Sequence, residues 1–226
     1  MVTQTPKAGF CQWQTVSQRC EGGDLLVNLI IAILIGYLVG SIPNGVLIGR
    51  YIFGVDPRTV GSGRTGGTNV YRAAGPKAGI LTAITDAFKG ILAVLLVRTL
   101  ITDNEMAAQL AGLFAVVGHN WSIFLKFKGG AGTMPNLGAM ATLSATMFVP
   151  AGLLGLISLY VWRMASLASL VVAWTGLLAA LLFAREYWLY AIGQALVVTW
   201  ALRPNIKRIL NGTERRIGER NKTPVN

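Results

Sequence analysis

Long apolar runs alternate with short polar segments from residue 25 to residue 202. A helix needs about 20 mostly apolar residues to cross the hydrocarbon core of a bilayer. Runs of this kind predict an all-α, polytopic membrane protein with seven transmembrane helices. Proline breaks or kinks a helix, so we divide the long run 137–162 near Pro150 into two short spans. The other spans are predicted at residues 25–43, extending as far as Phe53, and at 78–100, 106–125, 164–183 and 187–202.

A five-span arrangement, in which some of the short segments merge, is the alternative. The pattern predicts three parts of the chain: a polar extracytoplasmic segment at 1–24, a membrane domain at 25–202 and a basic cytoplasmic tail at 203–226. Apolar and basic residues are mixed in the tail around Ile206, Ile209 and Leu210. This mixture predicts a short amphipathic helix at the membrane surface, ended by Asn211 and Gly212.

The composition agrees with a membrane protein. Apolar residues make up 53% of the 226 residues, charged residues make up 13%, and the mean hydropathy is +0.55. A soluble domain usually contains about 25% charged residues. The net charge of +11 would suggest a nucleic-acid partner for a soluble protein. Here the cations lie between apolar spans, so membrane topology and anionic ligands explain them, and we expect no nucleic acid.

The distribution of basic residues predicts the orientation. In the seven-span arrangement, 15 of the 20 Lys and Arg residues lie on one side and 4 on the other, with Lys89 inside a span. The positive-inside rule therefore predicts an external N-terminus, a cytoplasmic tail and cytoplasmic glycine-rich loops. Cys11 and Cys20 precede the first span. They pair if that end faces an oxidising compartment and stay unpaired otherwise, and both alternatives remain open.

The polar segment between the first two spans, at residues 56–79, is rich in glycine. Four glycines fall within seven residues, hydroxyl and amide side chains lie among them, and four basic residues accompany them. Glycine allows close approach of a ligand to the backbone, successive N–H groups can bind an anion, and arginine matches phosphate oxygens. We interpret the segment as a phosphate-binding loop, with a flexible polar loop as the alternative. It is not a nucleotide-binding P-loop, because the pattern G-x-x-x-x-G-K-[ST] is absent.

A second loop after the third span repeats the combination of glycine and cation. Lys126 and Lys128 precede Gly129, Gly130 and Gly132. Two such loops on one face of the membrane would hold one phosphorylated substrate from two sides, or two substrates. In the alternative, the lysines are anchors at the membrane surface.

Three further groups of polar residues lie within or beside the spans. Asp86 and Lys89 fall on one helix face, which favours a structural ion pair inside the bundle for Asp86. A place in the wall of the site is the alternative, and for Lys89 both remain open. His119 is the only histidine and has no accompanying Cys or carboxylate cluster, so no metal site is predicted. Ser166 and Ser169 are also three residues apart, a spacing that commonly lets helices pack closely.

The order and spacing of these motifs resemble the bacterial acyl-phosphate:glycerol-3-phosphate acyltransferase family, from about residue 25 to residue 217. Each motif is modest by itself, whereas the ordered set is specific. The motifs are GSIP-x-G at 40–45, GVD-x-R-x-VGSG-x-x-G-x-TN-x-x-R at 54–72, D-x-x-KG at 86–90, GH at 118–119, FKGG-x-G at 127–132, R-x-x-SLAS at 163–169 and R-x-NI-x-R-x-L-x-GTE at 203–214.

The resemblance implies a seven-helix enzyme of the bacterial inner membrane, with residues 25–202 as its acyltransferase domain. Such an enzyme moves a fatty acyl group from acyl phosphate to the 1-hydroxyl of glycerol 3-phosphate and forms lysophosphatidic acid for phospholipid biosynthesis. The implied partners are these two substrates, membrane lipid and an acyl-phosphate-producing enzyme, with no cofactor and no metal. Catalysis would depend on positioning and on cationic and N–H donors, with a substrate phosphate taking the hydroxyl proton.

The resemblance also implies which residues form the site. The catalytic residues it implies are Ser62, Arg72, Ser166 and Asn205. The phosphate-binding residues that the motifs indicate are Gly61, Gly63, Arg64, Thr68, Asn69, Lys128, Gly129, Gly130, Gly132 and His119.

The chain departs from the family pattern inside these motifs. Ala131 stands where the family has a lysine between the glycines, and Leu202 stands where it has a histidine. Arg64 replaces the usual asparagine, and we hypothesise that it supplies the charge that is missing at Ala131. The departures favour an alternative function, a non-catalytic or substrate-altered paralogue that binds phosphorylated lipid precursors. A transporter is a third possibility, but it would place its polar residues near the membrane midplane rather than at one face.

Overall fold

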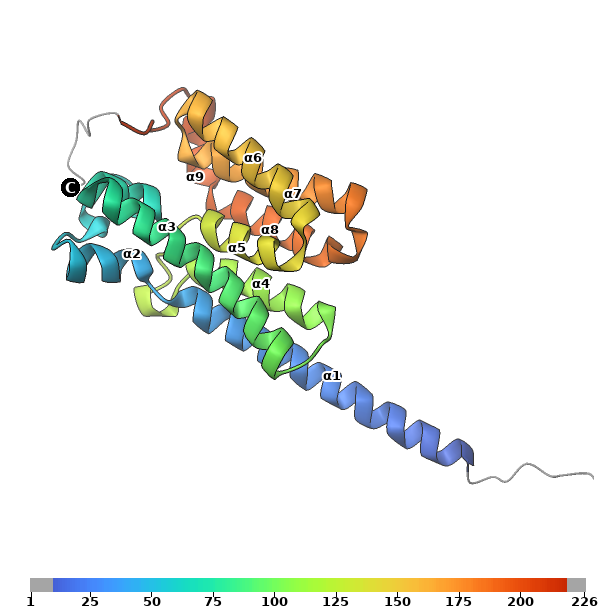
Figure 1. The fold of residues 1–226 in the computed structure, drawn as a ribbon. Helices are drawn as coiled ribbons and strands as arrows, with labels where there is room; N and C mark the ends of the chain where they lie inside the picture. Colours follow the sequence, from blue (N-terminus) through green and yellow to red (C-terminus); the bar gives the residue numbers. More distant parts are fainter. Residues whose placement is uncertain (1–9, 219–226) are drawn as a thin grey trace, which may run out of the picture.

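The computed structural model describes the backbone of residues 10–218 and the side chains of residues 24–218. Over that part of the chain every regular element is a helix, which confirms the predicted all-α class (Figure 1). The α-helices are α1 (Phe10–Ser41), α2 (Asn44–Leu47), α3 (Gly67–Leu100), α4 (Glu105–Asn120), α5 (Thr133–Leu143), α6 (Ala145–Trp162), α7 (Ala165–Phe183), α8 (Trp188–Ala201) and α9 (Arg203–Leu210). Shorter helical turns are η1 (Ile48–Ile52), η2 (Pro57–Thr59), η3 (Ile123–Leu125) and η4 (Arg185–Tyr187).

Within the described residues, five helical segments are long and apolar enough to cross a membrane: Asp24–Ile52, Gly67–Leu100, Glu105–Leu125, Ala145–Trp162 and Ala165–Phe183. Helices α5 and α8 have 11 and 14 residues, fewer than a full crossing needs. The protein is therefore a polytopic helical membrane protein, and the number of seven crossings stays a prediction. Cys11 and Cys20 lie outside the residues whose side chains are described.

The predicted division of residues 137–162 at Pro150 is wrong. The chain breaks at Ser144, whose extended backbone separates α5 from α6, and Pro150 lies inside α6. A proline removes one N–H donor, but helices in a membrane tolerate this loss where neighbouring groups satisfy the freed carbonyl. The proline therefore does not mark the position of the break, which lies six residues before it.

The glycine-rich segment is only partly a loop. Helix α3 begins at Gly67, inside the predicted loop 56–79 and eleven residues before Ala78, the first residue predicted for the second span. A kink follows at Gly75, where φ is 86°, directly before Pro76. Because only glycine adopts this backbone region at little cost, Gly75 separates α3 into two helical stretches, one before and one after the kink.

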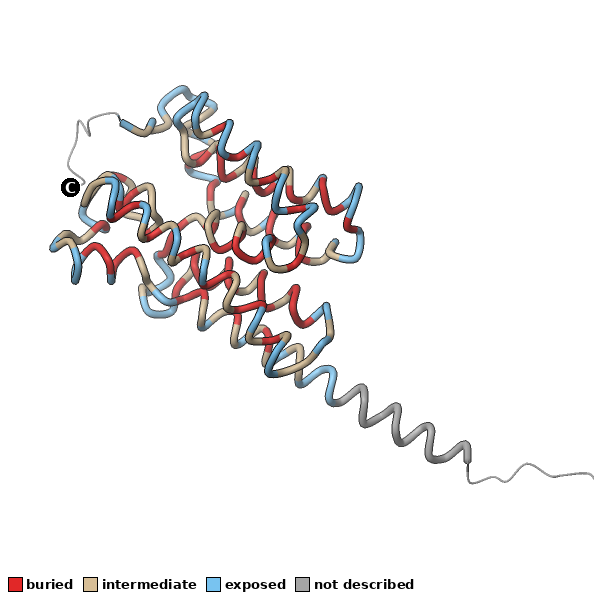
Figure 2. Tube along the Cα trace, in the orientation of Figure 1, coloured by how far each residue is buried: buried red, intermediate tan, exposed pale blue. Residues whose placement is uncertain are grey.

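Small residues bring the helices into close contact. A side chain added at Gly36 or Gly40 of α1 would collide with the backbone of Ala111 or Ala115 of α4. Such close approach is how membrane helices gain packing contacts without a hydrophobic driving force. On the outside, large apolar side chains such as Leu156 of α6 are exposed, and Figure 2 shows exposed positions along the outer faces of the helices. These faces suit contact with lipid.

Several of the segments between helices gather at one end of the bundle. In Figure 1 the segment with α2, the start of α3, the junction of α6 and α7, and α9 all lie near the end where the C-terminus is found. Helix α9 confirms the predicted short amphipathic helix, and its chain continues past Asn211 into an irregular segment. The backbone N–H of Ile217 then donates to the carbonyl of Arg163, 2.7 Å away, and fixes this segment at the start of α7.

Candidate active site

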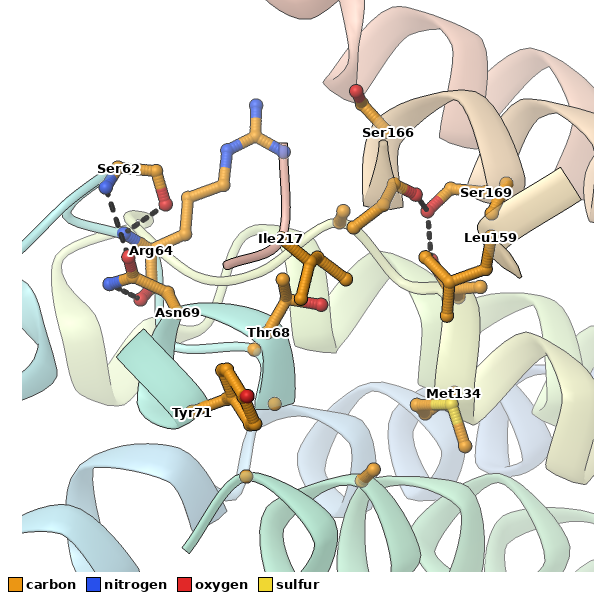
Figure 3. A pocket seen from close by; sticks show the side chains of 18 of the residues that line it. Ser62, Arg64, Thr68, Asn69, Tyr71, Met134, Leu159, Ser166, Ser169 and Ile217 are labelled. Carbon is orange, nitrogen blue, oxygen red and sulfur yellow. Dashed lines mark hydrogen bonds between the residues drawn. The ribbon is translucent and has the colours of Figure 1, made fainter. Parts of the chain in front are cut away.

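A cavity of about 430 Å³ opens at this end of the bundle. Figure 3 shows Ser62, Arg64 and Asn69 on one side of it, Ser166 and Ser169 on the other, and Ile217 between them. Of the predicted site residues, the wall contains Ser62, Arg64, Thr68, Asn69, Arg72, His119, Gly132, Ser166 and Asn205. Five separate motifs of the sequence therefore meet in one space, as the predicted site requires.

The remaining predicted residues do not line the cavity. Gly61 and Gly63 lie in the first loop and adopt φ of 61° and 68°, so they shape the loop through its backbone. Gly129 and Gly130 are buried beneath the wall, and the side chain of Lys128 is exposed outside it. The second glycine-containing loop thus reaches the cavity through residues 131–134 rather than through Lys128.

Asn69 holds the first loop in its shape. Its Nδ2 donates to the carbonyls of Pro57, Val60 and Arg64 at 2.6, 3.0 and 2.8 Å, and its Oδ1 accepts from the backbone N–H of Ser62 at 2.9 Å. The residue is 3% exposed. Since these four contacts use its amide group, Asn69 shapes the first loop, whereas the sequence predicted it as one of the loop's phosphate ligands.

The start of α3 supplies donors directly to the cavity. Gly66, Gly67 and Thr68 line it at the first turn of the helix, where backbone N–H groups lack partners within the helix. Such a helix N-terminus favours anions. Arg72 follows one turn later and also lines the cavity, so a positive side chain lies near the same helix end.

Arg64 extends from the first loop across to the end of α8. One of its terminal nitrogens, Nη2, donates to the carbonyl oxygen of Ala201 at 2.7 Å. The other, Nη1, is buried and has no hydrogen-bond partner. Burial lowers the pKa of the Arg64 guanidinium, repulsion from Arg208 lowers it further, and Glu214 opposes this shift.

Glu214 organises the opposite wall and was not assigned a role from the sequence. Its Oε1 accepts from Ser166 Oγ at 2.9 Å and from Asn205 Nδ2 at 2.8 Å, while Oε2 pairs with Arg208 Nε at 2.8 Å. One carboxylate therefore connects two predicted catalytic side chains from α7 and α9. A signal was present in the sequence, since Glu214 is an acidic residue in a strongly basic tail and ends the GTE motif.

A buried polar cluster lies beneath the cavity. The predicted ion pair is present, with Lys89 Nζ 3.0 Å from Asp86 Oδ1, and Lys89 also donates to the carbonyl of Ile42 at 3.0 Å. His119 Nδ1 lies 3.7 Å from the same Asp86 oxygen. Asp86 and His119 both reach the wall. In residues 24–218, no group of three or more His, Cys, Asp or Glu side chains is placed to hold a metal ion.

The fold and the site together define an integral membrane protein with a cationic cavity at one end of its helix bundle. The chain belongs to the glycerol-3-phosphate acyltransferase family, whose sequence profile matches residues 30–212. This membership confirms the resemblance noted in the motifs.

Similar proteins cover most of the chain. Glycerol-3-phosphate acyltransferase 2 of Moorella thermoacetica is 41% identical over 193 residues, which is 84% of this chain and 98% of the relative. A glycerol-3-phosphate acyltransferase of Thermus thermophilus is 40% identical over 190 residues, 83% of this chain and 94% of the relative. A crystal structure of PlsY, an integral membrane glycerol 3-phosphate acyltransferase in its glycerol 3-phosphate form, superposes with a TM-score of 0.76 at 34% identity, covering 84% of this chain and 96% of that one. A second structure of PlsY, in the lysophosphatidic acid form, gives a TM-score of 0.74 at 32% identity, with 84% and 95% covered.

Proposed function

We propose that this protein transfers an acyl group from acyl phosphate to the 1-hydroxyl of glycerol 3-phosphate. The observation that carries the proposal is the single cavity lined by Ser62, Arg64, Arg72, Ser166 and Asn205. The names of the relatives and of the two similar structures support the acceptor and the lipid product. The donor, the position of acylation and the inner-membrane location are parts of the proposal.

The cavity has a polar part for the phosphate of an acyl phosphate and an apolar part for its fatty chain. Cationic and N–H donors lie at Arg64, Arg72 and the first turn of α3. Apolar side chains, among them Met134 and Leu159, form much of the remaining wall (Figure 3). A phosphate at the polar end and a fatty chain along the apolar wall satisfy both kinds of surface.

In the proposed reaction, the 1-hydroxyl oxygen of glycerol 3-phosphate attacks the carbonyl carbon of the acyl phosphate. A new ester C–O bond forms, the bond from the carbonyl carbon to the phosphate oxygen breaks, and inorganic phosphate leaves. The hydroxyl proton passes to a phosphate oxygen of a substrate. Holding both substrates in one orientation and stabilising their charge supplies the rate acceleration.

The protein groups have distinct tasks in this scheme. Asn205 Oδ1 is buried without a hydrogen-bond partner, so it is available to accept from a glycerol hydroxyl. Asn205 Nδ2 and Ser166 are kept in place by Glu214. Arg72 and the first turn of α3 stabilise phosphate charge, and Ser62 donates or accepts at the mouth of the first loop.

The decisive experiment uses the purified full-length protein in detergent or liposomes with labelled glycerol 3-phosphate. Acyl phosphate is offered in one reaction, and acyl-CoA or acyl carrier protein thioester in others. We expect 1-acyl-glycerol 3-phosphate with acyl phosphate alone. Product from a thioester would contradict the proposed donor, and a 2-acyl product would contradict the proposed position. Binding of both substrates without product would instead support the non-catalytic paralogue suggested by Ala131 and Leu202.

A further inference from the structure

The Arg64 guanidinium is held at one nitrogen and unsatisfied at the other. Nη2 donates to the carbonyl of Ala201, the last residue of α8, across 137 positions of sequence. Nη1 is buried beside it without a hydrogen-bond partner. A buried charged donor that lacks a partner is costly, and native proteins rarely leave one unpaired. The guanidinium is therefore fixed at one nitrogen and leaves one unpaired donor, Nη1, in a residue that lines the cavity.

The chain itself offers no acceptor for this donor among its described acidic residues. Glu214 is the acidic residue whose charge acts on Arg64, but its two oxygens already accept from Ser166, Asn205 and Arg208. The other charge acting on Arg64 is Arg208, which is also positive. Two neighbouring guanidinium groups repel unless an anion lies near them. Glu214 pairs with Arg208 and offsets part of this repulsion, but Nη1 of Arg64 still has no acceptor, and a substrate phosphate would supply one.

Two residues of the cavity wall, Ala131 and Leu202, have side chains that cannot bind a phosphate. Ala131 lines the same cavity between two glycines and contributes a methyl group, and Leu202 contributes an aliphatic side chain. Neither donates a hydrogen bond. Because the side chains of Ala131 and Leu202 carry no charge, a positive group near them has to come from another element. Arg64 of the first loop lies close to Leu202, since it donates to the carbonyl of Ala201, the preceding residue.

We infer that Arg64 is the phosphate anchor of this site, with Nη2 fixed on the Ala201 carbonyl and Nη1 donating to a phosphate monoester. The inference rests on the proposed function, since the phosphate belongs either to glycerol 3-phosphate or to the acyl phosphate. It also makes Arg64 a link that aligns the first loop with the junction of α8 and α9. A planar fork can serve both positions at once, whereas a lysine ammonium is a single point charge.

The variant Arg64→Asn removes the fork. We expect it to raise KM for one of the two substrates about 10- to 100-fold, the loss typical of a charge-assisted hydrogen bond. Separate titrations of glycerol 3-phosphate and acyl phosphate identify which phosphate is bound. The matched control is Arg58→Asn in the same loop, because Arg58 is exposed and already pairs with Asp56 at 2.9 Å. The control should keep both KM values within about twofold, as expected for an exposed ion pair.

Ala131→Lys tests the same idea from the other side of the cavity. Combined with Arg64→Asn, it places an ammonium in the cavity where the wild-type chain has a methyl group. We expect the double variant to recover at least about tenfold of the lost affinity, the worth of one phosphate contact. In the double variant the Ala201 carbonyl still lacks the donor that Arg64 provides. A recovered KM would therefore show that the positive charge in the cavity, and not the structural contact, is what Arg64 contributes.

Binding of inorganic phosphate provides a readout that does not need activity. Phosphate should raise the melting temperature of the wild type and of Arg58→Asn, but raise that of Arg64→Asn much less. If Arg64→Asn does not fold, Arg64→Lys takes its place, with the same direction expected because one ammonium cannot serve both positions. The inference is overturned if the Arg64 variant keeps both KM values and the phosphate-induced shift within about twofold of the wild type. A wild type that binds phosphate through Arg64 but forms no product would reject the proposed reaction and leave the anchor in place.

Discussion

The two glycine-containing loops look alike in sequence, but their glycines do different work. In the first loop, residues 56–66, Gly61 and Gly63 adopt positive φ and turn the backbone so that neighbouring side chains face the cavity. In the second loop, residues 121–132, a side chain at Gly129 or Gly130 would collide with the backbone or ring of His119. The first loop needs glycine for its conformation, and the second needs it for space.

The loops also differ in what holds them. One side chain, Asn69, ties the first loop together through four hydrogen bonds. The second loop is held by its own backbone, with Gly129 N–H donating to the Asn120 carbonyl at 3.1 Å and Gly130 N–H to the His119 carbonyl at 2.9 Å. The combination of glycine and cation therefore identifies two candidate loops but does not reveal which one presents side chains to a ligand.

The largest expected effect comes from filling the space in the second loop. In Gly129→Ala, the new methyl group would meet the backbone carbonyl of His119, which cannot move aside as a flexible side chain could. We expect a loss of about 3 kcal/mol or more in stability, at the upper end for overpacking. Thermal unfolding in detergent measures it. Gly152→Ala is the control, because a methyl group at Gly152 in α6 meets open space. Equal melting temperatures for both variants would contradict the claim that the second loop needs glycine for space.

The next largest effect is a difference in stability between substitutions of two asparagines, Asn69 beside the first loop and Asn120 beside the second. Asn69→Ala leaves the carbonyls of Pro57, Val60 and Arg64 without their donor, and we expect a loss of about 2 kcal/mol. The amide of Asn120 beside the second loop is buried without a partner. Asn120→Ala should therefore cost less than Asn69→Ala. Thermal unfolding and limited proteolysis of the first loop provide the measurement, and a larger loss in Asn120→Ala would contradict the assignment.

Activity should depend on Arg72 of α3, which follows the first loop, and not on Lys128 of the second loop. Arg72 lines the cavity, whereas Lys128 is exposed outside it. Arg72→Ala should lower kcat/KM by about 10- to 100-fold, as expected for a lost charged hydrogen bond. For Lys128→Ala we expect a change below about threefold, as for an exposed charge. Steady-state kinetics with both substrates test this pair. A large loss in Lys128→Ala would restore the phosphate-binding role that the family resemblance implies for this residue.

The smallest expected effect concerns the ion pairs at the start of the first loop. Hydrogen bonding from Arg58 is the main cause that lowers the pKa of Asp56, from 3.8 to about 2, with the charges of Arg58 and Arg50 adding to it. Because the pKa is lower in the folded state, the stabilisation is present above pH 4 and is lost as the pH falls from 4 towards 2. We expect less than about 1 kcal/mol, since the arginines are partly exposed. Melting temperatures of the wild type and Asp56→Asn should converge over this pH range, and a constant difference would contradict the pairing.

The sequence was sufficient for the class of protein, and it singled out many of the residues that line the cavity. Whether an apolar or a polar residue is favoured at a position depends directly on its contact with lipid or water. The pattern of apolar and polar residues therefore predicted the all-α membrane class and the amphipathic helix α9. The order of the motifs indicated the family. The polar side chains that the motifs singled out on the first loop, α7 and α9 all line the cavity. The break between α5 and α6 did not follow, because the prediction relied on Pro150, whereas the extended backbone at Ser144 is visible only in the structure.

What only the tertiary structure decided is which groups meet across long sequence separations. The contact between Arg64 and the Ala201 carbonyl, and the meeting of Ser166 with Glu214 across 48 positions, have no local signature. The same holds for Lys128, whose side chain points outside the cavity while the glycines after it are buried. Local pattern determines how each residue interacts with water or lipid, whereas hydrogen-bond partners and the space available to a side chain depend on how the helices pack.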